Sequence, residues 1–217
     1  MNRPVTPSLP RLVLIGEAFT TPAQADRLLA AVGAGINWVH LRAHEASTDR
    51  FRRAARGLVP WLRAASPSVL VSINSRLPVA RELRTGFHTG AEGPSLRVAR
   101  LRLGAAPPLG YSAHAAAEAS TAVRAGATYV FLSPIFPTSS KPGHPGVGLQ
   151  ALADVVAHVA PAPVYALGGI TPARIATCLE AGAYGVAVLS GILHANDAAA
   201  AARRYLQALA DASPMAS

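Results

Sequence analysis

The chain has 217 residues, 51% of them hydrophobic, and a formal net charge of +9 at pH 7. This length suits one domain as well as two small ones, and the apolar fraction is enough for a sizeable core. The one cysteine, Cys178, excludes an internal disulfide and a CxxC metal site, and the apolar run at residues 12–15 is too short for a signal peptide or a membrane span. We therefore expect a soluble cytoplasmic protein without a membrane partner.

The positive charge comes almost entirely from arginine, because Lys141 is the only lysine among the 20 basic residues. The arginines are scattered, no aromatic residues are interleaved with them, and no nucleic-acid-binding motif accompanies them. We expect them on solvated helix faces rather than on a nucleic-acid surface. A positive field would still favour the arrival of an anionic substrate.

Short apolar runs alternate with longer, alanine-rich amphipathic stretches along the chain. The apolar runs predict eight strands, at 11–15, 38–41, 69–73, 86–88, 109–111, 129–132, 164–167 and 185–188. The stretches between them predict helices at 22–32, 48–64, 77–83, 96–101, 115–124, 149–157, 172–181 and 197–212. Several of these helices end at a glycine next to alanine, as at Gly126, and a strand follows directly.

Nearly continuously apolar strands that alternate with helices indicate a parallel sheet covered on both faces. We predict an α/β fold, a single (β/α)8 TIM barrel over residues 1–217 with flexible ends at about 1–10 and 212–217. An open, doubly wound sheet is the alternative, although no G-x-G-x-x-G follows the first strand. In a barrel, the active site lies at the C-terminal ends of the strands.

The ends of the last two predicted strands indicate a phosphate site, because glycine-rich turns let backbone N–H groups approach an oxyanion. The candidate residues are Gly168, Gly169, Leu189, Ser190 and Gly191. Lys141 lies in the loop after the sixth strand, together with Thr138 and Ser140. We expect this lysine to supply the compensating positive charge.

His40, His88 and His114 each fall at a predicted strand end, and His44 lies in the loop beyond the second strand. Several histidines at one barrel mouth suggest general acid–base chemistry. His114 ranks first because it follows Ser112 and opens a helix, whose N-terminus favours the neutral ring. A zinc site built from His40, His88 and His114 is an alternative. We expect no magnesium site, since the strand ends lack the carboxylates that this ion prefers.

Three segments, at 110–119, 129–149 and 165–193, resemble the thiamine phosphate synthase / TenI superfamily. The resemblance implies a small (β/α)8 barrel of thiamin biosynthesis. One branch of the superfamily joins a pyrimidine diphosphate to a thiazole phosphate, and the other is a tautomerase that aromatises the thiazole. The resemblance also implies that the two glycine turns hold the phosphate and that Thr138, Ser140 and Lys141 match the T-x-[TS]-K loop.

The sequence departs from the synthase pattern at several positions. Ser75 and Gly93 stand where the synthase branch has magnesium-binding aspartates, and its Gln-Leu-Arg signature reads His40-Leu41-Arg42. The tautomerase branch relies on the histidine of G-x-S-x-H, and residues 110–114 match that motif with His114.

We therefore expect a cofactor-independent thiazole tautomerase, an isomerase in which His114 moves a proton on a carboxylated dihydrothiazole phosphate. The side chains expected to contact this substrate are His40, Arg42, Asn74 and Ser112. Three alternatives stay open: a thiamine phosphate synthase, a non-catalytic barrel that binds thiazole phosphate, and an isomerase of another phosphorylated metabolite. A homodimer is one option for the assembly.

Overall fold

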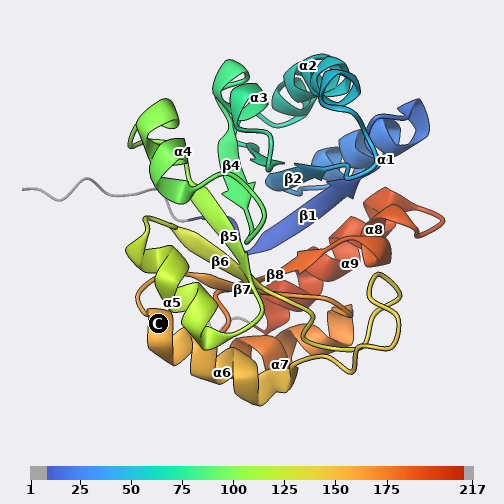
Figure 1. Cartoon of the computed structure of the whole chain (residues 1–217). Coiled ribbons are helices and arrows are strands. Elements are labelled where there is room, and N and C mark those ends of the chain that lie inside the picture. The colour runs from blue at the N-terminus through green and yellow to red at the C-terminus, as the bar shows by residue number, and fades with distance from the viewer. Residues whose placement is uncertain (1–8, 213–217) are drawn as a thin grey trace, which may run out of the picture.

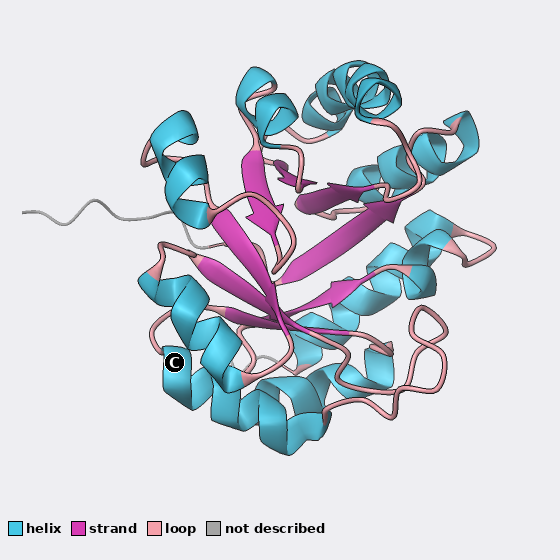
Figure 2. Ribbon diagram, in the orientation of Figure 1, coloured by secondary structure: helices cyan, strands magenta, loops and turns pink. Residues whose placement is uncertain are grey.

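The computed structural model describes residues 9–212, which form a closed barrel of parallel strands (Figure 1). The strands pair in chain order from β1 to β8, and β1 also pairs with β8. Figure 2 shows the strands as an inner layer with the helices around them. The predicted single (β/α)8 barrel is therefore confirmed, and the open-sheet alternative is wrong because the sheet has no free edge.

Each predicted strand is present. The strands are β1 (Leu12–Glu17), β2 (Trp38–Arg42), β3 (Leu70–Asn74), β4 (Gly86–Thr89), β5 (Leu109–Ala113), β6 (Tyr129–Leu132), β7 (Val164–Leu167) and β8 (Gly185–Val188). The helices are α1 (Pro22–Gly33), α2 (Thr48–Ala65), α3 (Leu77–Glu82), α4 (Leu96–Leu103), α5 (Ala116–Arg124), α6 (Gly148–Val159), α7 (Ile175–Glu180), α8 (Ser190–Leu193) and α9 (Ala198–Asp211), with a 3-10 turn η1 (Pro172–Arg174) before α7.

Three segments differ from their prediction. The stretch predicted as one helix from residue 172 is divided into η1 and α7, and the short helix α8 between β8 and α9 was not predicted at all. The strand β5 also extends to Ala113, which places Ser112 inside the strand rather than after it. All three differences lie at or after the C-terminal end of a strand, which is the end of the barrel where the pocket described below is found.

The helices cover the sheet with apolar faces that their residue spacing dictates. In α2, Phe51, Leu58 and Leu62 recur at helical spacing and are buried, while the arginines between them lie outside. The Ser47 side chain caps this helix by accepting a hydrogen bond from the backbone N–H of Arg50 at 3.3 Å. Burial of each such large side chain contributes roughly 1.5–3 kcal/mol.

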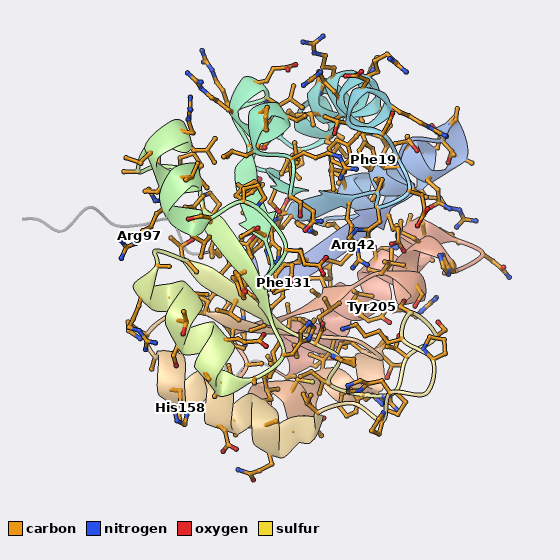
Figure 3. All side chains as sticks on the ribbon, in the orientation of Figure 1. Phe19, Arg42, Arg97, Phe131, His158 and Tyr205 are labelled. Atoms are coloured by element: carbon orange, nitrogen blue, oxygen red, sulfur yellow. The ribbon has the colours of Figure 1, made fainter. Side chains whose placement is uncertain are left out.

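Aromatic side chains fill the N-terminal half of the barrel interior. The ring of Trp38 lies edge-on to Tyr129 at 4.8 Å and to Tyr165 at 5.3 Å between centroids. Phe131 packs against the same cluster from the centre of the barrel (Figure 3). This plug closes one end of the barrel, so a ligand can enter only from the other end.

The predicted flexible ends fall mainly on residues 1–8 and 213–217, which lie outside the described residues. Within residues 9–212, no helix combines the length and the apolar character needed to cross a bilayer.

The barrel interior is packed tightly enough that replacing one of its glycines with alanine should destabilise the protein. A Cβ added at Gly110, in β5, would overlap the Tyr129 ring and His88 Nδ1. We expect Gly110→Ala to lower the free energy of unfolding by about 1–3 kcal/mol, because both neighbours are fully buried and cannot move away. Chemical denaturation followed by circular dichroism would measure this change.

Gly57→Ala is the matched control, because a Cβ at this position in α2 meets nothing within 4 Å. Alanine is the better helix former, so this variant should gain up to about 1 kcal/mol. Equal stability of the two variants would contradict the tight packing of the barrel interior.

Candidate active site

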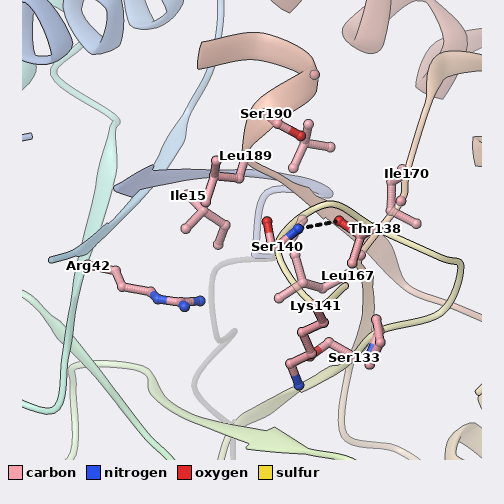
Figure 4. Close-up of a pocket in the computed structure, with 16 residues that line it drawn as sticks. Ile15, Arg42, Ser133, Thr138, Ser140, Lys141, Leu167, Ile170, Leu189 and Ser190 are labelled. Atoms are coloured by element: carbon pink, nitrogen blue, oxygen red, sulfur yellow. Dashed lines mark hydrogen bonds between the residues drawn. The ribbon is translucent and has the colours of Figure 1, made fainter. Parts of the chain in front are cut away.

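A pocket opens at the C-terminal mouth of the barrel, between the loops that follow β6, β7 and β8 (Figure 4). Polar and glycine residues of its lining are Arg42, Ser133, Thr138, Ser140, Lys141, Gly168, Gly169, Ser190 and Gly191. Its apolar lining is Ile15, Pro134, Leu167, Ile170, Ala187, Val188 and Leu189. The pocket therefore has an apolar floor of strand residues and a rim of polar groups and backbone.

The turn after β7 brings backbone close to the pocket. Gly168 and Gly169 have φ values of +98° and +64°, which residues other than glycine rarely adopt. A Cβ at Gly169 would lie 2.6 Å from the carbonyl oxygen of Pro137, so the turn also packs directly on the β6 loop. The Tyr205 hydroxyl, from α9, donates to the carbonyl of Ile170 at 2.9 Å and holds the turn from behind.

The turn after β8 faces the same pocket. Ser190 and Gly191 begin the short helix α8 and line the pocket together with Leu189. The first N–H groups of a helix have no partner inside the helix, so these amides are available to an anion. The β6 loop comes from the other side, where a turn joins the backbone N–H of Lys141 to the carbonyl of Thr138 at 3.1 Å.

Two cations line this pocket, and no aspartate or glutamate does so among the described residues. Figure 4 shows the Arg42 side chain extending from β2 toward the loop that carries Ser140 and Lys141. The Arg42 Nε lies 3.7 Å from the Glu17 carboxylate, an ion pair between half-exposed groups. The local charge of the pocket is positive, as an anionic ligand requires.

His114 is exposed and does not line the pocket, but one hydrogen bond connects it to the lining. Its Nδ1 lies 2.5 Å from the carbonyl oxygen of Ser133. A carbonyl only accepts, so Nδ1 carries a proton and donates it to this hydrogen bond. The Glu118 carboxylate accepts from the backbone N–H of His114 at 2.9 Å and fixes this position further.

His40 and His88 are not at strand ends, because β2 and β4 continue past them, and both side chains are buried inside the barrel. His40 Nδ1 lies 2.9 Å from the Ser72 hydroxyl, and His88 bridges the Tyr129 and Ser112 hydroxyls at 3.1 and 2.8 Å. The two rings stack edge to face with centroids 4.9 Å apart.

Burial, with smaller effects from the nearby Arg42 and His44, lowers the pKa of His40 to about 3. Burial also lowers the pKa of His88 well below its ordinary value, with His40 and Arg42 adding to the effect. Both rings are therefore neutral near pH 7. Within residues 9–212, no three His, Cys, Asp or Glu side chains gather closely enough to hold a metal ion, so the zinc alternative has no ligand set.

The structure thus brings most of the predicted site residues together around one pocket. Arg42, the three residues of the β6 loop and both glycine turns line it. The predicted residues outside the lining are His40, Asn74, Ser112 and His114. Sequence reasoning missed the apolar floor and Ser133, although Ser133 directly follows β6 and could have been found by the strand-end rule.

A sequence profile described as "Thiamine monophosphate synthase" matches residues 12–192 of this chain. The chain belongs to this family. A Chloroflexus aurantiacus protein named thiamine-phosphate synthase is 36% identical over 198 residues, which cover 89% of this chain and 90% of the relative. A Salinispora tropica protein with the same name is 37% identical over 207 residues, 93% of this chain and 98% of the relative.

The fold comparison agrees with this family. A structure titled thiamine phosphate pyrophosphorylase from Pyrococcus furiosus superposes with a TM-score of 0.81. It covers 93% of this chain and 96% of its own, at 24% identity. At that identity, the likeness supports the barrel fold alone.

The expectation of a thiazole tautomerase is wrong, because the relatives at 31–38% identity carry the name of the synthase. The expectation depended on His114 and on the missing aspartates. In the structure, His114 is exposed and tied to a loop carbonyl, so its presence in a motif does not identify a proton transfer in the pocket. An isomerase is accordingly not supported, whereas an enzyme of thiamin biosynthesis is.

The buried histidines predict a pH dependence of stability. The folded pKa of His40 lies near 3, below its unfolded value of 6.5, so the unfolded state binds protons first as the pH falls. The contribution of His40 to stability is fully present above its pKa in the unfolded state. It is lost as the pH falls toward its pKa in the folded state. Between about pH 7 and pH 5, the parent should therefore lose about 2 kcal/mol more of its free energy of unfolding than His40→Gln loses.

Urea unfolding at the two pH values would measure the difference. His158→Gln is the control, because His158 lies on the exposed face of α6 (Figure 3). It should leave the pH dependence of the parent unchanged. An unchanged pH dependence in His40→Gln would show that His40 is not held neutral by the fold.

Proposed function

We propose that this chain is a thiamine-phosphate synthase, a transferase that joins a pyrimidine diphosphate to a thiazole phosphate. What supports the proposal is the positively charged pocket at the barrel mouth of a chain whose relatives carry that name. In the reaction, a bond forms between the thiazole nitrogen and the pyrimidine's side-chain carbon. The bond from that carbon to the diphosphate breaks, and the diphosphate leaves with the electron pair.

In this proposal, the thiazole phosphate binds to the two glycine turns. The amides of Gly168, Gly169, Ser190 and Gly191 line the pocket and would donate to phosphate oxygens. Lys141 supplies a positive charge from the β6 loop, where Thr138 and Ser140 offer hydroxyl groups. These contacts orient the thiazole ring toward the apolar floor, where its nitrogen can meet the second substrate.

In this proposal, the pyrimidine binds on the side of the mouth that carries the remaining predicted residues. Asn74 pairs in register with His88 on the neighbouring strand, next to the mouth. Ser112 accepts or donates one hydrogen bond to His88, and His40 lies beside the same ring. We assign His114 a positioning role, because its ring holds the Ser133 carbonyl at the pocket wall.

Magnesium is the metal that the resemblance to the synthase branch implies. The residues at the ends of β3 and β4 are Asn74, Ser75, Thr89 and Gly90. Glu92 is exposed, and Glu17 is paired with Arg42. Magnesium is usually held by one or two carboxylates together with substrate phosphates. The side chains present at this part of the mouth do not fit such a site.

The proposed role of Lys141 predicts a loss of catalytic efficiency. Lys141→Ala should lower kcat/KM for thiazole phosphate by about 10- to 100-fold, since a hydrogen bond to a charged group contributes about 1.5–3 kcal/mol. Lys141→Arg keeps the charge and should retain more of the activity. Formation of thiamin phosphate from the two half-molecules, followed by chromatography, would measure both variants.

Arg97→Ala is the matched control, because it removes one positive charge from the exposed outer face of α4 (Figure 3). It should retain the parent activity. The proposal would be overturned if the unmodified protein formed no thiamin phosphate from the two half-molecules, with or without a divalent cation.

A further inference from the structure

Arg42 has an unusual position for an arginine at a protein surface. It ends β2, lines the pocket and is half-buried, and its guanidinium forms no hydrogen bond with another described residue. Its Nε is buried without a hydrogen-bond partner, because the Glu17 carboxylate at 3.7 Å is too distant for one. A buried N–H without a partner is costly, so this group is prepared for a ligand that accepts hydrogen bonds.

The protein adds further positive charge to the same side of the mouth. Arg76 follows β3, and its guanidinium donates to the carbonyls of Ala43 and Ala46 at 3.0 and 2.7 Å. The same group lies over the Phe51 ring at 4.4 Å, so it cannot swing away. The charge of Arg76 is therefore fixed beneath the loop that follows Arg42.

The positive charges of Arg42 and Arg76 affect the neighbouring His44. Burial lowers the pKa of His44, and among the nearby charges Arg42 and Arg76 lower it while Glu17 and Glu45 raise it. Glu17 is the carboxylate that the structure places against Arg42. With Lys141 on the β6 side, the pocket is built to hold a multiply charged anion by cationic side chains.

We propose that this pocket binds a diphosphate group through Arg42 and Lys141 directly, without a divalent cation. The inference rests on the proposed function, since the diphosphate is the leaving group of that reaction. A guanidinium can donate two parallel hydrogen bonds to phosphate oxygens and carries its charge at any physiological pH. Arg42 and Lys141 thus neutralise the charge that develops when the bond from the pyrimidine carbon to the diphosphate breaks.

Calorimetry of inorganic pyrophosphate with the full-length protein would test this directly. The expected result is binding in excess EDTA with a Kd within about threefold of the value in magnesium, since the cationic side chains remain present in both. Binding that disappears in EDTA and returns with magnesium would overturn the inference.

Two variants separate direct binding from binding through a metal. Arg42→Gln should weaken pyrophosphate binding in EDTA by at least about tenfold, whereas Arg97→Gln on the outer face of α4 should not change it. Glu17→Gln should tighten binding or leave it unchanged, because it removes the negative charge beside Arg42. If Glu17→Gln weakens binding, the carboxylate is holding a cation for the anion, and the inference is wrong.

The inference and the proposed function can fail separately. Pyrophosphate binding in EDTA without any formation of thiamin phosphate would support the inference and contradict the proposed function. Formation of thiamin phosphate that stops in EDTA, with pyrophosphate binding lost as well, would support the function and overturn the inference.

Discussion

The backbone ladder between β1 and β8 is the constraint on which the other features of this protein depend. Leu12 pairs with Val186 and Leu14 with Val188, and these bonds leave the sheet without an edge. A closed sheet tilts its strands around one axis, so all the loops after the strands converge on one mouth. Residues as distant in sequence as Arg42, Lys141 and Ser190 meet in one pocket for this reason.

The side chains inside the barrel form an aromatic layer in its N-terminal half and a polar layer above it. Trp38, Tyr129 and Tyr165 plug the N-terminal half with edge-to-face contacts. Above them, His40 and His88 form a polar layer that burial keeps neutral. The two histidines therefore add no charge beneath the mouth, and the charge that an anionic substrate meets comes from Arg42 and Lys141 in the pocket lining.

The two sides of the mouth offer different groups to an anionic ligand. The glycine turns depend on backbone geometry, which Gly168 and Gly169 provide through positive φ. The side of the mouth formed by β2, β3 and β4 carries Arg42, Ser75 and Thr89, and an arginine supplies charge there where a metal would need carboxylates. A carboxylate can hold a diphosphate only through a metal ion, whereas an arginine can bind it directly.

The sequence by itself determined the barrel, its strands and the rim of the pocket. Apolar runs alternating with amphipathic stretches leave few packing solutions, and Gly168-Gly169, Ser190-Gly191 and the Lys141 loop follow strands whose ends must meet. Local patterns could not decide which histidines face solvent, because a strand that extends one residue further buries what looked like its end, as at His88. Nor could they decide the reaction, since the motif around His114 predicted a tautomerase and the relatives are named thiamine-phosphate synthase. Burial and hydrogen-bond partners are set by residues distant in the chain, and only the tertiary structure brings those residues together.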